Sequence, residues 1–117
     1  MAEDRLAHHD LCFGCGQANL FGLQLELVRT AGGVEGRFFV KQDHQGPEGF
    51  AHAGVLTAAL EEAIALAAGR RPTRLSVELL APAPVGAFVR VAADASSATA
   101  SDEEGGVLAR AEATLDI

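Results

Sequence analysis

The chain has 117 residues, of which 49% are hydrophobic, and it carries 16 acidic against 9 basic side chains. This length predicts one domain over residues 1–117, large enough to bury a core without metals or disulfides. The net charge of −7 argues against non-specific nucleic-acid binding, and no uninterrupted apolar run reaches membrane-spanning length. Two cysteines and a charged N-terminus without an apolar signal core lead us to expect a cytoplasmic protein.

The first part of the chain predicts an irregular segment followed by a β-hairpin. Residues 1–21 contain a Gly- and Cys-rich tight loop. Residues 23–30 then alternate leucines with other side chains, which is close to the period of a half-buried strand. The Ala-Gly-Gly sequence at residues 31–33 predicts a turn, and residues 34–41 predict the returning strand.

Residues 50–68 read FAHAGVLTAALEEAIALAA and predict a long helix. The helix is apolar nearly all round, so we expect it to be buried. Its only charges are the adjacent Glu61 and Glu62. A buried carboxylate must be paired, neutralised or facing a wet cavity. Because helical neighbours are about 100° apart, we expect the two carboxylates to face different places, one of them a cleft.

The remainder of the chain predicts three strands. Gly69 is a predicted helix C-cap, after which strands are expected over residues 74–80, 87–95 and 107–117. A Pro- and Gly-containing turn separates the first two strands, and an acidic turn over residues 102–106 precedes the third. The predicted fold class is therefore α+β, an antiparallel sheet wrapped around one long central helix.

Several short motifs occur along the chain in an order and with a spacing that match a known family. They are Cys12-Phe-Gly-Cys15-Gly-Gln-Ala-Asn19, Gly22-Leu23, His44-Gln-Gly46, Gly49, His52-Ala-Gly54, Glu61-Glu62-Ala63 and Pro82. In these segments the chain resembles hotdog-fold acyl-CoA thioesterases of the PaaI-like group, particularly those that open with Cys-Phe-x-Cys-Gly. The resemblance implies a hotdog fold and a homodimer, or a dimer of dimers. It also implies hydrolysis of an acyl-CoA thioester at the subunit interface, with no metal or organic cofactor.

The resemblance implies catalytic roles for residues of the helix. Glu61 falls where these enzymes place the carboxylate that acts as nucleophile or general base, although a salt bridge to an arginine across the dimer is the alternative. Ala53 falls where a glycine N–H binds the thioester oxygen, and we expect the Gly54 N–H to assist it. His52 is expected to shape the helix start by hydrogen bonding more than to transfer protons. Since His52 and Glu61 lie roughly 13 Å apart along a helix, two subunits would share the site.

Candidate substrate-binding residues lie at both ends of the predicted helix. Coenzyme A is anionic, so an acidic protein needs a local basic patch to bind it. The basic candidates are Arg70, Arg71 and Arg74, whose alternative role is that of a solvated helix end. Many members of the family carry Asn or Gln six residues before the helix-start histidine, where this chain has Gly46. We expect a shifted loop to bring Gln45 or His44 into that role.

Three other interpretations remain open. The first is a non-catalytic hotdog module that binds acyl-CoA or another small ligand, and the second is a purely structural dimer. The third is a hydratase, for which Asp43 and His44 are the nearby but poorly surrounded candidates.

The N-terminal histidines and cysteines raise the separate question of a metal. His8, His9, Cys12 and Cys15 include a C-x-x-C pair of the kind that zinc binds. Adjacent histidines bind one ion with difficulty, however, and structural zinc sites usually take a second ligand pair from farther along the chain. The resemblance accounts for both cysteines as a loop motif, so the sequence alone leads us to expect no metal.

Overall fold

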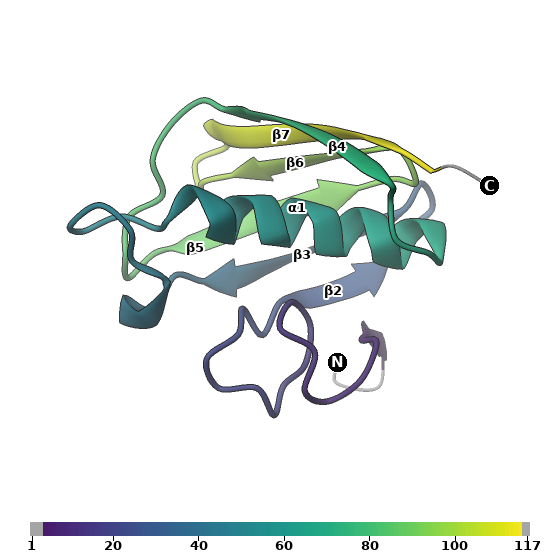
Figure 1. Cartoon of the computed structure of the whole chain (residues 1–117), viewed down its shortest axis with the longest axis horizontal. Coiled ribbons are helices and arrows are strands. Elements are labelled where there is room, and N and C mark those ends of the chain that lie inside the picture. Colours follow the sequence, from purple (N-terminus) through teal and green to yellow (C-terminus); the bar gives the residue numbers. More distant parts are fainter. Residues whose placement is uncertain (1–3, 116–117) are drawn as a thin grey trace.

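The computed structural model describes residues 4–115. Within them, seven strands form one antiparallel sheet in the order β1-β2-β3-β5-β6-β7-β4, and α1 crosses one face of it (Figure 1). The elements are β1 (Arg5–Leu6), β2 (Glu26–Arg29), β3 (Val34–Phe39), the 3-10 helix η2 (Gln42–His44), α1 (Ala53–Ala68), β4 (Arg74–Leu79), β5 (Phe88–Ala93), β6 (Ser97–Ser101) and β7 (Val107–Thr114). This arrangement confirms the predicted sheet around one long central helix.

The helix α1 begins at Ala53, three residues after the predicted start. The physical reason is its N-cap, His52, whose Nδ1 accepts a hydrogen bond from the Gly54 N–H at 2.8 Å. The helix ends at Gly69, which has a left-handed φ of 78° and confirms the predicted C-cap. In residues 4–115, no helix combines the length and apolar character needed to cross a bilayer.

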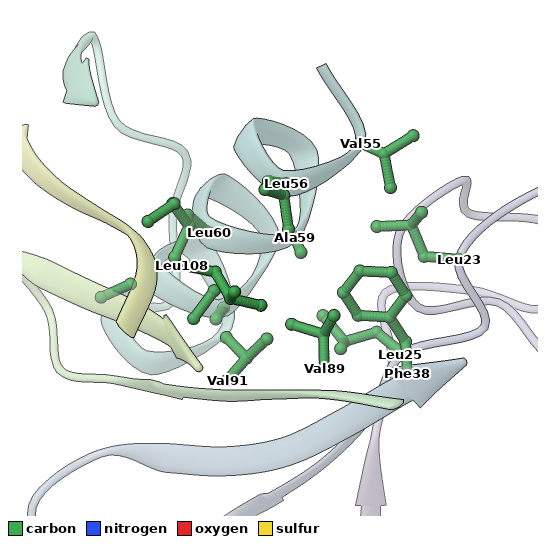
Figure 2. Packing of buried hydrophobic residues seen from close by; sticks show 14 of the residues in the cluster. Leu23, Leu25, Phe38, Val55, Leu56, Ala59, Leu60, Val89, Val91 and Leu108 are labelled. Atoms are coloured by element: carbon green, nitrogen blue, oxygen red, sulfur yellow. The ribbon is translucent and has the colours of Figure 1, made fainter. Parts of the chain in front are cut away.

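The core fills the space between α1 and the sheet, as Figure 2 shows. Leu56 and Leu60 point from the helix toward Phe38 of β3 and toward Val89 and Val91 of β5, and all five are at most 3% exposed. Burying each side chain of this size stabilises the fold by about 1.5–3 kcal/mol. The predicted burial of the helix is therefore confirmed.

The predicted strand over residues 23–30 is ordered as β2 only across Glu26–Arg29. Upstream of it, the backbone N–H groups of Leu23 and Leu25 donate to carbonyls of the N-terminal loop instead of to β3. Gln24 lies between them with a φ of 50°, in the left-handed region that interrupts a regular strand. The N-terminal loop thus replaces a neighbouring strand along this stretch.

Two strands, β1 and β6, were not predicted. In β6 the core-facing positions are Ala98 and Ala100, and the positions between and beside them carry hydroxyl side chains. Serine and alanine have low strand propensity, and pairing with β5 and β7 on either side overrides it. The other predicted strands are found as β3, β4, β5 and β7; residues 116–117 of the last prediction lie outside the described residues.

His44 connects the loop before α1 to the start of the chain. Its ring is 2% exposed, its Nε2 lies 3.1 Å from the Gly22 carbonyl oxygen, and its Nδ1 accepts the Lys41 N–H at 3.0 Å. This geometry requires the neutral ring with its proton on Nε2. Burial is the main cause that lowers the pKa of His44, and the Lys41 charge adds to it against the opposing effects of Gly22 and Asp43.

We expect the stability of the fold to decrease at mildly acidic pH because of His44. The unfolded chain protonates this ring near its ordinary pKa of 6.5 and the folded chain resists it, so the free energy of unfolding falls as pH drops through that value. Urea denaturation at about pH 8 and about pH 5.5 measures this slope. The variant His44→Gln should show a smaller slope, whereas His9→Gln should keep it. An unchanged slope in His44→Gln contradicts this assignment.

Candidate functional site

The two helix carboxylates share one arginine. Arg71 Nη1 lies 2.8 Å from Glu61 Oε1 and 3.0 Å from Glu62 Oε1. The Glu61 side chain is 30% exposed, whereas that of Glu62 is 4% exposed. The two carboxylates were expected to face different places; one points outward and the other inward, but the long Arg71 side chain reaches both. Glu61 therefore forms a salt bridge within its own chain, whereas the alternative role considered for it was a salt bridge across the dimer.

Glu62 is buried against the N-terminal loop. Its Oε2 lies 2.7 Å from His8 Nδ1 and accepts the Cys12 thiol at 3.4 Å. Burial alone would raise the pKa of Glu62, but the Cys15 thiol, the hydrogen bond and charge of Arg71 and the charge of His8 together lower it. Hydrogen bonds to both glutamates raise the pKa of Arg71 although burial opposes them. The interior of the site thus holds an ionised carboxylate with an arginine beside it.

The loop that covers Glu62 is held by its own backbone. Gly16 N–H donates to the Cys12 carbonyl at 2.8 Å, and the Cys12 N–H donates to the His9 carbonyl at 3.1 Å. Both cysteines are buried free thiols. Burial, followed by contact with the Glu62 carboxylate, raises the pKa of Cys15 to about 12. The loop therefore presents its two sulfur atoms inward, toward the helix.

The structure brings together only part of the expected N-terminal group. His8, Cys12 and Cys15 converge, whereas the His9 ring turns away and accepts the Leu11 N–H. Sequence reasoning did not include the fourth member, Glu62, which lies in the interior beside these three residues. One feature of the sequence could have identified it, because a carboxylate in an apolar helix needs a polar partner from another segment.

The start of α1 offers one backbone donor. Among residues 4–115, the Ala53 N–H has no hydrogen-bond partner, whereas the Gly54 N–H donates to His52 Nδ1. In the same range, Gln24 is the one residue other than glycine with a positive φ, so the backbone at Ala53 carries no left-handed strain. His52 therefore accepts the hydrogen bond of one expected donor, the Gly54 N–H, and leaves the Ala53 N–H open.

The loop before α1 uses its polar side chains internally. Gln45 Oε1 accepts the Gly49 N–H, and both ring nitrogens of His44 are engaged in the interior. A Cβ at Gly46 would lie 2.7 Å from the Cα of His52, which explains a glycine where relatives of the resembled family carry Asn or Gln. We therefore leave His44 out of the substrate contacts, and with it the hydratase interpretation.

The three arginines after the helix have different surroundings. All three are exposed, and Arg71 alone among them pairs with the two helix carboxylates in residues 4–115. Arg70 Nη2 donates to the Leu115 carbonyl at 2.6 Å, and Arg74 begins the edge strand β4. Arg71 therefore has carboxylate partners within its own chain, and the expectation that all three arginines bind an anionic ligand stays a prediction.

We expect Gly14→Ala to destabilise the protein, because the loop approaches the helix closely there. A Cβ at Gly14 would lie 2.6 Å from Cδ, Cγ and Oε1 of Glu62, so the buried side chain must shift. The expected cost is about 1–3 kcal/mol of unfolding free energy, measured by urea denaturation. The control Gly32→Ala meets no atom within 4 Å and should stay within about 0.5 kcal/mol of wild type. Equal stabilities of the two variants would show that the loop is not packed on Glu62.

No protein-family model matches the chain, and no curated protein sequence matches it. Solved structures do. A thioesterase superfamily protein, RHA08564, matches with a TM-score of 0.69 and 21% identity over 79% of this chain, which spans 53% of that protein. The E. coli PaaI protein from the phenylacetic acid degradation operon matches with a TM-score of 0.66 and 13% identity, over 82% of this chain and 83% of that one. A hypothetical thioesterase from Streptococcus pneumoniae, solved with coenzyme A, matches with a TM-score of 0.66 and 14% identity, over 76% and 81%. The chain therefore has the hotdog fold that these thioesterase-superfamily proteins share.

Proposed function

We propose that the protein hydrolyses acyl-CoA thioesters to a free acid and CoA, at a site completed by a second copy of the chain. The observation that carries the proposal is Glu61, a partly exposed carboxylate in the middle of the mostly apolar central helix of a hotdog fold. The pneumococcal protein of the same fold, solved with coenzyme A, supports the substrate class.

Glu61 is the reactive group in this proposal. Arg71 Nη1 lies 2.8 Å from the Glu61 carboxylate, and this ion pair fixes the direction of the carboxylate. The carboxylate either attacks the thioester carbonyl or takes a proton from an attacking water. In the first route the C–S bond breaks as an acyl anhydride forms on Glu61, and water then hydrolyses this anhydride to the acid and restores the carboxylate. In the second route water adds to the carbonyl directly and the C–S bond then breaks. CoA leaves as the thiol in both routes. The distance along the helix between the Ala53 N–H and Glu61 does not decide between the two routes.

Ala53 is the proposed donor to the thioester oxygen. Its N–H is open at the start of α1, where the helix dipole adds positive potential. Gly54 is a second donor only when its N–H leaves the His52 ring, to which it donates at 2.8 Å. His52 is therefore a positioning residue for the first turn. Gln45 acts in the same way on the neighbouring loop through its bond to Gly49.

Exposed cations bind the anionic part of the substrate in this proposal. Arg70 and Arg74 lie just beyond the C-terminal end of the helix and are exposed. Their charges supply local positive potential on a chain whose net charge is −7. Arg71 contributes through Glu61 instead of binding phosphate directly.

The homodimer forms along the edge strand β4. Among the strands of residues 4–115, this one pairs with β7 on one side only, and an unpaired edge offers backbone N–H and C=O groups to a second strand. Leu79, the last residue of β4, and Leu80, which follows it, are 54% and 48% exposed. Pairing of two β4 edges would bury these leucines and place the partner's loop opposite the exposed side of Glu61.

Glu61→Ala should lower the rate of thiol release from acyl-CoAs by at least ~100-fold, the magnitude expected for a catalytic carboxylate. The measurement uses a panel of short-, medium-chain and aromatic acyl-CoAs, with the oligomeric state checked by sedimentation. The control Glu104→Ala removes an exposed carboxylate from the acidic turn and should keep the wild-type rate. Equal rates in wild type and Glu61→Ala would remove the Glu61 mechanism. No turnover on any substrate, with acyl-CoA retained, would favour the binding module instead.

Leu79→Lys should shift the protein from dimer to monomer and reduce turnover with it, because a charge would enter the proposed strand pairing. Analytical ultracentrifugation measures the shift, and circular dichroism checks that the fold is kept. Ala92→Lys places the same charge at an exposed position on β5 and should leave the dimer intact. A dimer that persists in Leu79→Lys would place the interface elsewhere.

A further inference from the structure

Four groups of metal-binding chemistry meet between the N-terminal loop and the middle of α1. One ligand atom each from His8, Cys12, Cys15 and Glu62 lies within 4.8 Å of the other three. Cys12, Cys15 and Glu62 are buried, and Cys12 and Glu62 are 50 residues apart in the chain. The helix thus supplies the distant ligand that the short N-terminal segment lacks on its own. The proposed hydrolysis uses none of these four side chains.

The distances among these atoms fit a tetrahedral ion. Bonds of about 2.3 Å to sulfur and about 2.0 Å to nitrogen or oxygen separate tetrahedral ligand atoms by about 3.3–3.8 Å. Cys12 Sγ lies 3.4 Å from Glu62 Oε2 and 3.8 Å from His8 Nδ1, and Cys15 Sγ lies 3.5 Å from His8 Nδ1. The shortest pair, His8 Nδ1 to Glu62 Oε2, is a 2.7 Å hydrogen bond that an ion between the two atoms would replace.

The charges around the group also balance. Two thiolates and the Glu62 carboxylate carry three negative charges; a divalent ion neutralises two of them, and the Arg71 guanidinium offsets the third while it also pairs with Glu61. Arg71 Nη1 bonds Glu62 Oε1 at 3.0 Å, which leaves Oε2 directed at the sulfur atoms and at His8. Arg71 Nη2 also lies 3.4 Å from His8 Nδ1. A hydrogen bond that orients a ligating carboxylate in this way is a usual outer partner of a metal site.

The loop is shaped to present its sulfur atoms. The His8 N–H donates to Cys15 Sγ at 3.1 Å, a contact that stabilises a thiolate. Gly16 passes so close to the Asp10 carbonyl oxygen that a Cβ there would lie 2.3 Å from it. The tight turn therefore requires glycine and keeps Cys12 and Cys15 pointed at the helix.

We propose that His8 Nδ1, Cys12 Sγ, Cys15 Sγ and Glu62 Oε2 bind one structural Zn²⁺ ion that fastens the N-terminal loop to α1. Two sulfur ligands with one nitrogen and one oxygen suit zinc better than magnesium or calcium. Binding releases the two thiol protons, and His8 binds through its unprotonated Nδ1 with the ring proton on Nε2. Four protein ligands leave no position for water, so the ion stabilises the loop and takes no part in hydrolysis.

The test is metal analysis of the full chain, purified under reducing conditions after growth with zinc. The expected result is one zinc per chain. Replacement by Co²⁺ should give the thiolate-to-cobalt charge-transfer and visible bands of a tetrahedral sulfur site. Cys12→Ser and His8→Gln should weaken zinc binding by more than ~10-fold, since even outer partners of metal ligands have effects of that size. His9→Gln changes the adjacent histidine outside the group and should keep one zinc per chain.

A second measurement covers the case in which a cysteine variant fails to fold. His8 is partly exposed, so His8→Gln should remain folded, and a chelator should lower the melting temperature of wild type but not that of His8→Gln. Wild type without zinc after incubation with excess Zn²⁺ would overturn the proposal. Zinc content unchanged in both ligand variants would overturn it as well. A Cys12–Cys15 disulfide that persists under reducing conditions would assign the cysteines to redox chemistry instead.

Discussion

The buried carboxylate of Glu62 is the constraint around which the rest of the site is arranged. A charge in the middle of an apolar helix is stable only when other segments bring partners to it. The N-terminal loop brings His8 and Cys12, and the turn after the helix brings Arg71. One side chain thus connects the helix to the turn that follows it and to the N-terminal loop, which is about 50 residues away in the sequence. Removing it would leave the loop without its main polar attachment to α1.

This connection also determines the environment of Glu61. The buried Glu62 carboxylate holds the Arg71 guanidinium against the helix. In that position the guanidinium also bonds the more exposed Glu61. An exposed ion pair on its own contributes little, since both side chains must be ordered to form it. Here the buried Glu62 already orders the Arg71 side chain, so the pair with Glu61 requires less additional ordering. The adjacent glutamates therefore have separate roles, one in holding the structure and one in presenting a carboxylate.

Sequence reasoning predicted the architecture because periodicity and turn residues carry it. The apolar run before Gly69 could only be a buried helix, and the glycine turn at residues 31–33 could only join neighbouring strands. Sequence reasoning missed β6 because Ala98 and Ala100 have little strand propensity of their own. Only the strands on both sides fix them in the sheet. Long-range pairing of small residues leaves no strong local pattern.

The site was less predictable for a related reason. The polar group around Glu62 depends on a contact across 50 residues, and one sequence does not reveal which helix position a loop will cover. The helix start followed local rules more closely: His52 caps it, and the negative φ of Ala53 explains how alanine replaces the glycine of the resembled motif. At this position a glycine is not required for its conformational freedom. Alanine keeps the same N–H at the same place, so the substitution preserves the donor and alters only the space beside it.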